Sequence, residues 1–148
     1  KITEDTFRKK HLLITFWASW DKPSLKGIQK LRNVKDSIKS KNFDILNIAL
    51  DHDTIAWENA VKNDSIVGYN VCERMAWNSE ITSKFDIDSL PFSILVSPYQ
   101  RIIKYKVDLE KDIALIDSLT KKYDKSQEEQ KKRDELEKKK IKKNKNRK

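Results

Sequence analysis

The sequence predicts an α/β fold in which a central mixed β-sheet is flanked by helices. Two continuous apolar runs, residues 11–19 and 43–51, have the composition of strands that are covered on both faces, as in a parallel pair. Each run is followed by a segment with helical spacing of its apolar residues, which makes two βα units. Two later runs, at 92–97 and 101–107, are close enough in sequence to form an antiparallel hairpin.

The first βα unit joins "HLLITFWAS" to a helix that we expect from about residue 22 to 40. Its apolar residues recur at helical spacing between lysines, at Leu25, Ile28, Leu31 and Ile38. The second unit joins "FDILNIALD" to a helix in the segment 54–64. Because such crossovers are right-handed, the carboxyl ends of the two strands should lie side by side at one edge of the sheet.

The remaining elements are shorter. Residues 69–76 should form a loop or a short edge strand, and a short helix should follow in 79–85, capped by Asn78 or Ser79. The final helix should start near Leu109, with a buried stripe made of Ile113, Ile116 and Leu119. Apolar residues almost vanish after Tyr123. We therefore expect a domain at residues 1–123 and a basic, solvated tail, helical or disordered, at 124–148.

Positive charge is concentrated in this tail. The net charge of the 148 residues is +9, of which residues 121–148 contribute +8 and residues 1–120 only +1. A near-neutral body argues against a folded nucleic-acid-binding face, so no specific nucleic-acid partner is expected. Acid-before-base pairs four residues apart support a solvated helix: Glu128–Lys132, Glu129–Arg133, Asp134–Lys138 and Glu135–Lys139. Weak contact of the tail with anionic surfaces is the alternative function.

Membrane and cysteine signals are sparse. No apolar run approaches the roughly 18 residues of a membrane span, and the first ten residues lack the apolar core of a secretory signal. The chain begins with Lys1 rather than methionine, so we expect a further segment upstream in the full-length protein. Cys72 is the sole cysteine, which excludes an intramolecular disulfide and a multi-thiolate metal site.

Four segments in order resemble the TlpA/ResA-type thiol-disulfide oxidoreductases, thioredoxin-like proteins of the bacterial cell envelope. "LLITFWASWDKPS" is similar to the family's "FWASWCxPC" segment, and "DSLPFSILVSPYQRII" is similar to "IPTTFLIDPEGKII", in which the proline is cis and faces the redox motif. Residues 50–64 and 76–87 match the family's middle region. The resemblance covers about residues 8–120. It implies a thioredoxin-like fold, a cis bond between Leu90 and Pro91, and a periplasmic or cell-envelope location.

The sequence differs from the family at the positions that carry out its redox chemistry. Asp21 and Ser24 stand where the resemblance places the two redox cysteines, and neither side chain can form or resolve a disulfide. Thr15 stands where many thioredoxins have a buried acid that manages proton transfer. We therefore interpret two segments as a pseudo-active site, which consists of Trp20, Asp21, Lys22, Pro23, Ser24, Leu90 and Pro91.

Within the pseudo-active site, Asp21 suits the N-cap of the first helix and Pro23 suits its first turn. A structural cap is therefore favoured over a ligand-contacting role for Asp21. Trp17 is expected in the core, whereas Trp20 is a candidate contact surface. For Pro91, a role in the fold alone and a role in pairing with an extended polypeptide both stay open.

Other candidate sites are weaker. Asp51, His52 and Asp53 follow the second strand at the edge where open α/β sheets place ligands. Three consecutive side chains cannot all face one ion, and Asp53 suits a helix N-cap, so neither a metal nor a cofactor is expected. His11 is expected to be incidental. Cys72 should be a half-buried, inert thiol, with a redox role or an intermolecular disulfide as alternatives.

The sequence thus predicts a redox-inactive thioredoxin-like domain that binds or scaffolds a protein, or an extended peptide, at the pseudo-active site. The competing hypothesis is an enzyme. In that version the domain remains a thiol-disulfide oxidoreductase that acts through Cys72 together with a thiol of its partner.

Overall fold

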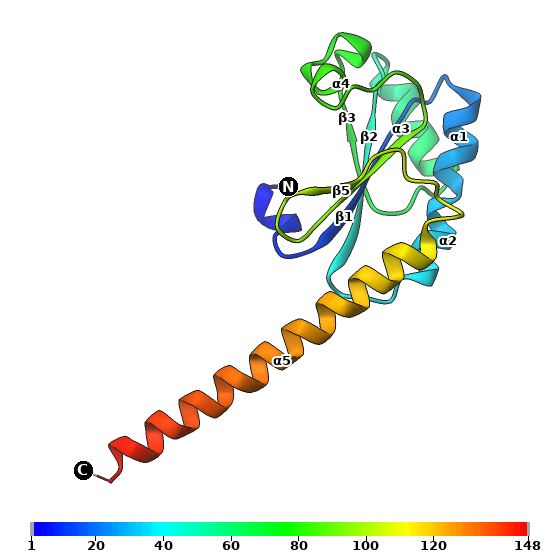
Figure 1. Ribbon diagram of the computed structural model, residues 1–148. Coiled ribbons are helices and arrows are strands. Elements are labelled where there is room, and N and C mark those ends of the chain that lie inside the picture. The colour runs from blue at the N-terminus through cyan, green and yellow to red at the C-terminus, as the bar shows by residue number, and fades with distance from the viewer. Residues whose placement is uncertain (1, 148) are drawn as a thin grey trace.

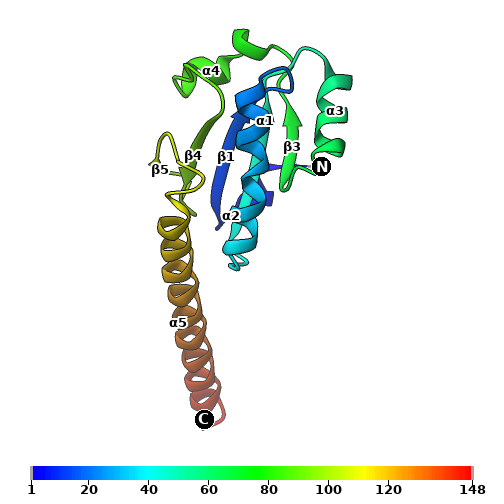
Figure 2. The ribbon, with the colours of Figure 1, turned by 90° about the vertical axis from the view of Figure 1, so that its right-hand side faces the viewer.

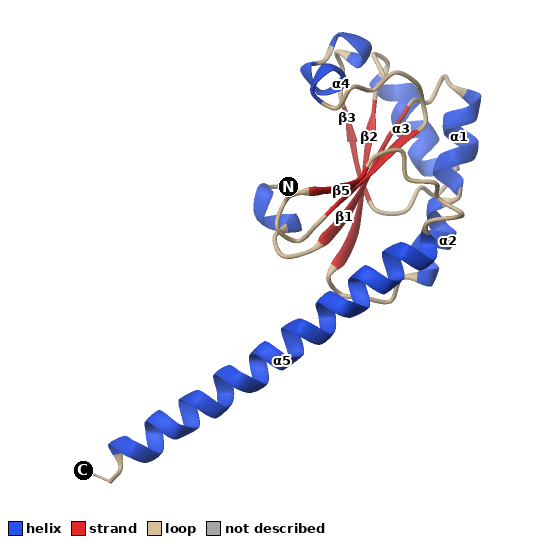
Figure 3. Cartoon of the chain, viewed as in Figure 1, coloured by secondary structure: helices blue, strands red, loops and turns tan. Residues whose placement is uncertain are grey.

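The computed structural model describes residues 2–147, in which five strands form one sheet and helices cover both of its faces (Figures 1 and 3). The strands are β1 (His11–Trp17), β2 (Phe43–Ala49), β3 (Tyr69–Cys72), β4 (Phe92–Val96) and β5 (Ile102–Lys104). The α-helices are α1 (Lys22–Gln29), α2 (Leu31–Ser37), α3 (Thr54–Asn63), α4 (Glu80–Lys84) and α5 (Ile113–Lys145). Two short 3₁₀ helices are η1 (Glu4–Phe7) and η2 (Ala76–Asn78).

The strand order is β3-β2-β1-β4-β5, with β1, β2 and β3 parallel and with β4 antiparallel to both β1 and β5. In this register Trp17 lies opposite Ala49, and Ala49 lies opposite Cys72. On the other side of β1, Phe16 lies opposite Phe92. The carboxyl ends of β1, β2, β3 and β5 and the amino end of β4 therefore meet at one edge, at the top of Figure 1, which we call the upper edge.

The mixed sheet, the hairpin and the edge strand agree with the sequence prediction, but two helix boundaries were wrong. The helix expected at 22–40 is divided at Lys30, where the backbone tightens because the Lys30 N–H donates to the Gly27 carbonyl (3.0 Å). The last helix begins at Ile113 rather than near Leu109. The Asp108 carboxylate accepts hydrogen bonds from two backbone N–H groups that follow it, and the resulting turn delays the helix.

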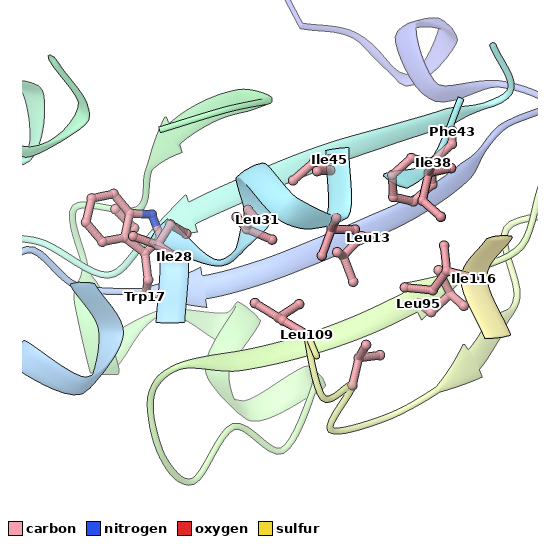
Figure 4. Close-up of a cluster of buried hydrophobic side chains, with 13 residues drawn as sticks. Leu13, Trp17, Ile28, Leu31, Ile38, Phe43, Ile45, Leu95, Leu109 and Ile116 are labelled. Carbon is pink, nitrogen blue, oxygen red and sulfur yellow. The ribbon is translucent and has the colours of Figure 1, made fainter. Parts of the chain in front are cut away.

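The sheet buries an apolar layer on each face because successive side chains of a strand point to opposite sides. One layer packs beneath α1, α2 and α5 and includes Leu13, Trp17, Ile28, Leu31, Ile45, Leu95 and Ile116 (Figure 4). The second layer includes Phe16, Ile48, Ile87, Phe92 and Ile94. Trp17 has no exposed surface, so its predicted core position is confirmed.

The helix α5 is attached to the domain by its first turns and then projects away from it, as the two views in Figures 1 and 2 show. The Tyr123 ring is buried and meets the His11 and Tyr99 rings edge-on, with centroids 5.7 and 6.2 Å away. The Asp124 carboxylate accepts hydrogen bonds from Ser40 Oγ (2.9 Å) and Asn42 Nδ2 (2.7 Å). Every residue from 128 to 147 is exposed.

The exposed part of α5 differs in detail from expectation. Across residues 2–147, none of the four acid-base pairs expected in the tail lies at ion-pair distance. Asp134 instead accepts a hydrogen bond from Gln130 Nε2 (2.9 Å), because an amide and a carboxylate four residues apart also meet on a helix surface. Over the same residues, no helix is both long and apolar enough to cross a membrane.

Candidate functional site

The corner between β1 and α1 carries the first segment of the pseudo-active site. Asp21 has extended backbone geometry, and its Oδ2 accepts a hydrogen bond from the Ser24 N–H (2.8 Å). Lys22 and Pro23 follow as the exposed first residues of α1. This is the N-cap arrangement that the sequence predicts, and such a cap contributes about 1 kcal/mol of stability. The cap also places a negative charge at the positive end of the helix dipole.

Ser24 lies one turn into α1 and is fully buried. Its Oγ has no hydrogen-bond partner among the residues that the structure describes. A buried hydroxyl normally has a partner, since desolvating it without one is unfavourable. A thiol is only a weak donor and acceptor, so it tolerates such surroundings better. The space around position 24 is therefore better matched to an apolar side chain or to a thiol than to a hydroxyl.

The corner is held from the neighbouring strand by Asp51, which is almost completely buried. Its carboxylate accepts hydrogen bonds from the Ser19 N–H (3.0 Å to Oδ2) and from Ser19 Oγ (2.7 Å to Oδ1). The Trp20 indole N–H donates to the Leu50 carbonyl (3.3 Å). These bonds fix the exit of β1 to the end of β2. The sequence suggested Asp51 only as a candidate metal ligand. The one local indication of its pairing with the corner was Ser19, a short polar residue between two tryptophans.

The three consecutive residues Asp51, His52 and Asp53 point to different partners. His52 Nδ1 lies 2.8 Å from the Arg74 carbonyl, in the connection after β3. Asp53 caps α3, as predicted, and accepts from two backbone N–H groups at 2.9 and 3.0 Å. Among residues 2–147, no group of three or more His, Cys, Asp or Glu side chains is arranged to hold a metal ion.

The second segment of the pseudo-active site reaches the same edge from β4. Phe92 pairs with Phe16, so the preceding Pro91 lies beside the corner where β1 ends. The Leu90–Pro91 peptide bond is cis. The Pro91 ring lies against α1 so closely that a Cβ added to Gly27 would sit 2.7 Å from Pro91 Cγ. Leu90 is partly buried against the second apolar layer. The fold thus brings both predicted segments together.

Cys72 lies at the upper edge but away from the α1 N-terminus. It is the last residue of β3, and β2 separates it from β1, which corresponds to about 10 Å at a strand spacing of about 4.8 Å. The partly buried thiol donates to the Asp51 carbonyl (3.3 Å). Burial raises the pKa of the Cys72 thiol above its ordinary value, so the protonated form predominates at neutral pH.

Thr15 is buried in β1, opposite Ser93 of β4. The two hydroxyl oxygens are 3.0 Å apart and satisfy each other. A neutral hydroxyl pair therefore occupies the core at the place where the family resemblance leads one to expect an acid. No proton acceptor with carboxylate strength is available at this position.

Four large apolar side chains that follow β1, β2 and β3 are exposed at the upper edge, and we call them the apolar rim. They are Trp20 (59% exposed), Ile55 (70%), Met75 (59%) and Trp77 (42%). Trp20 follows β1, Ile55 follows β2, and the other two follow β3. Side chains of this kind gathered in one region are typical of an interaction surface. The sequence identified only Trp20, because the position of the segment after β3 depends on its pairing with β2.

Comparisons with known proteins agree with this architecture. A family model described as thioredoxin-like matches residues 9–102. The thiol-disulfide oxidoreductase ResA of Bacillus subtilis (strain 168) is 22% identical over 104 residues, which are 70% of this chain and 56% of that protein. The chain thus spans a little over half the length of this curated relative.

Two solved structures are similar in both fold and sequence. A thiol-disulfide oxidoreductase from Bacteroides fragilis NCTC 9343 is 35% identical with a TM-score of 0.67, over 75% of this chain and 80% of that one. The C-terminal domain of a putative thiol-disulfide oxidoreductase from Bacteroides thetaiotaomicron is 33% identical with a TM-score of 0.74, over 80% and 82%. The chain therefore belongs to the thioredoxin-like family and, within it, to the TlpA/ResA-type thiol-disulfide oxidoreductases.

Proposed function

We propose that this domain is a redox-inactive member of its family that binds an extended segment of a partner protein at the pseudo-active site. The observation that carries the proposal is the state of the α1 N-terminus. A thiolate would be activated there by the helix dipole, but the position holds the carboxylate of Asp21, engaged as an N-cap. The family motif would accordingly be replaced by Asp-Lys-Pro-Ser at residues 21–24.

Thiol-disulfide exchange requires a thiolate that attacks a disulfide sulfur and a second thiol that resolves the mixed disulfide. The Asp21 carboxylate cannot attack a disulfide sulfur in this way, and the Ser24 hydroxyl cannot resolve a mixed disulfide. The sole cysteine, Cys72, has a raised thiol pKa and donates its hydrogen to a carbonyl. The alternative function, exchange through Cys72 with a partner's thiol, would therefore begin from a poorly ionised nucleophile.

Two features of the upper edge support the binding function. The apolar rim offers Trp20 as a flat, exposed ring whose indole N–H is already paired, so an incoming apolar side chain can cover the ring without stranding a donor. At the same edge, the segment with the cis Leu90–Pro91 bond leads into β4, where an incoming extended chain would pair with backbone groups. A cell-envelope location, as in the family that the chain resembles, is part of this proposal.

Redox inactivity is tested by restoring the two sulfurs. In a Cys72→Ser background, Asp21→Cys with Ser24→Cys places two thiols one helical turn apart at a helix N-terminus. Reduction of insulin driven by dithiothreitol should stay at the uncatalysed rate for the natural chain and rise well above it for the engineered pair. Catalysis by the natural chain would refute the proposal. The Cys72→Ser variant alone would then show whether that thiol is responsible.

Binding is tested by selecting peptides from a random library with the intact chain and measuring the affinities of the selected sequences. Trp20→Ala should weaken their binding at least tenfold, which is the usual effect of truncating a central aromatic contact. Tyr99→Ala is the matched control, because Tyr99 is also aromatic and is more exposed than Trp20, but it follows β4, at the opposite end of the sheet. Equal losses in the two variants, or no selectable peptide, would count against a binding site at the upper edge.

A further inference from the structure

The positive charge of α5 is divided sharply along the helix. Residues 125–137 contain four basic and five acidic side chains, so this stretch is nearly neutral. Residues 138–148, which we call the cationic tip, contain eight basic and no acidic side chains. The tip therefore carries a charge of +8, whereas the whole of residues 1–120 carries +1.

The helix keeps this charge away from the domain. Asp124 makes the last hydrogen bonds between α5 and the domain that the structure describes, and the helix continues without interruption to Lys145. The 14 residues from Asp124 to Lys138 span about 21 Å at a rise of about 1.5 Å per residue. The nearly neutral stretch thus acts as a spacer, and Figures 1 and 2 show the end of α5 standing clear of the sheet.

Within the tip, most of the lysines share one face of the helix. At about 100° per residue, five of them fall within an arc of about 160°: Lys138, Lys139, Lys142, Lys143 and Lys145. All five are exposed. Ile141, the only large apolar residue of the tip, lies outside this arc. The lysine face is therefore charged and nearly free of apolar surface, which suits a layer of negative charge.

We propose that the cationic tip binds the surface of an anionic phospholipid bilayer and so tethers the domain to that surface. Lysine-rich clusters on a helix are attracted to anionic lipid through the negative surface potential. Nucleic acid fits less well. No aromatic residue follows Tyr123 to stack on bases, the lysine face has no arginine for bidentate contacts, and the body adds no basic face.

The size of the effect follows from the number of lysines in contact. Each lysine near an anionic surface strengthens partitioning about fivefold, so three or more in contact from one face give about 100-fold. The attraction acts within a screening length of about 10 Å at about 0.1 M salt and about 3 Å at about 1 M salt. Because the face offers almost no apolar area, binding should disappear at high salt rather than merely weaken.

The experiment measures co-sedimentation of the intact chain with vesicles of phosphatidylcholine alone or with phosphatidylglycerol added as the anionic component. We expect binding only to the anionic vesicles at about 0.1 M salt, and none at about 1 M salt. Replacing the five lysines of the face by glutamine should weaken binding about 100-fold. A matched control removes the same charge from the body, with glutamine at Lys26, Lys35, Lys39, Lys41 and Lys62, all of which are exposed.

The control should retain most of the binding. Equal losses in the two five-lysine variants would overturn the proposal, since they would assign the attraction to net charge and not to the tip. Absence of binding to the anionic vesicles would also overturn it. A duplex oligonucleotide that displaces the protein from vesicles at equal phosphate concentration would assign the tip to nucleic acid instead. Circular dichroism of both variants checks that α5 stays helical.

Discussion

Gly27 in α1 provides a sensitive test of the contact between the first helix and the Pro91 segment. An alanine Cβ at this position would lie 2.7 Å from Pro91 Cγ and 3.3 Å from Pro91 Cβ. Carbon atoms in van der Waals contact are about 3.5–4.0 Å apart, so one of the two segments must move by several tenths of an ångström. The ring is rigid and belongs to the backbone, and it cannot rotate away as a flexible side chain would.

Two opposing effects set the magnitude of Gly27→Ala. Helix propensity alone favours alanine over glycine by about 1 kcal/mol. Overpacking of a tight contact costs about 1–3 kcal/mol. We therefore expect the free energy of unfolding to fall by about 1 kcal/mol instead of rising by the same amount, a difference that urea unfolding monitored by tryptophan fluorescence resolves.

The control for this prediction lies one residue earlier in the same helix. Lys26 is exposed, so the stability difference between Lys26→Ala and Lys26→Gly reports the propensity of α1 without any clash. If Gly27→Ala raised stability by as much as that difference, the close approach of Pro91 to α1 would be refuted. Contact between Pro91 and α1 could then no longer explain why the two segments of the pseudo-active site lie side by side.

Four further predictions use other parts of the structure. Ser24→Ala and Ser24→Cys should each raise the free energy of unfolding by about 1 kcal/mol in urea, because they remove a buried hydroxyl that has no hydrogen-bond partner within residues 2–147; a loss of stability of that size would mean that the hydroxyl has such a partner. Asp51→Asn should lower stability by about 1–3 kcal/mol and alter the tryptophan fluorescence spectrum, since the Ser19 N–H and hydroxyl lose a charged acceptor; unchanged stability and spectrum would contradict this anchoring role. Burial lowers the pKa of His11, so the unfolded chain takes up the proton first and stability should decline as the pH falls below about 6.5. His11→Phe should flatten that decline between pH 7 and 5, and an identical slope would assign it to other groups. Truncation after residue 128 should leave the melting temperature nearly unchanged, whereas truncation after residue 122 should lower it by several degrees, because only the second removes the buried Tyr123 ring; equal melting temperatures would refute the packing of α5.

Local signals in the sequence predicted much of this structure correctly. The strands β1 and β2 could be recognised because a strand covered on both faces must be apolar throughout. The N-caps at Asp21 and Asp53 could be recognised because a cap depends only on the next three residues. The edge strand and the hairpin followed from the spacing of short apolar runs.

Features that depend on contacts between distant segments could not be read in this way. The bond between Ser19 and Asp51 joins residues 32 positions apart, and nothing local distinguishes a buried carboxylate from an exposed one. Met75 and Trp77 look like ordinary apolar residues until the pairing of β3 with β2 places them at the upper edge. The break at Lys30 lies within an unbroken helical pattern of apolar residues, so periodicity alone could not locate it.

The anchoring of the corner by Asp51 has a consequence for how such a domain evolves. The exit of β1 is held by Ser19 and by the Trp20 indole, and both bonds end on residues 50 and 51, directly after β2, rather than on residue 21. The position of the α1 N-terminus therefore does not depend on which side chain occupies position 21. A lineage could exchange a nucleophile for a cap there, or restore the nucleophile later, at the cost of about one capping interaction and without redesigning the scaffold.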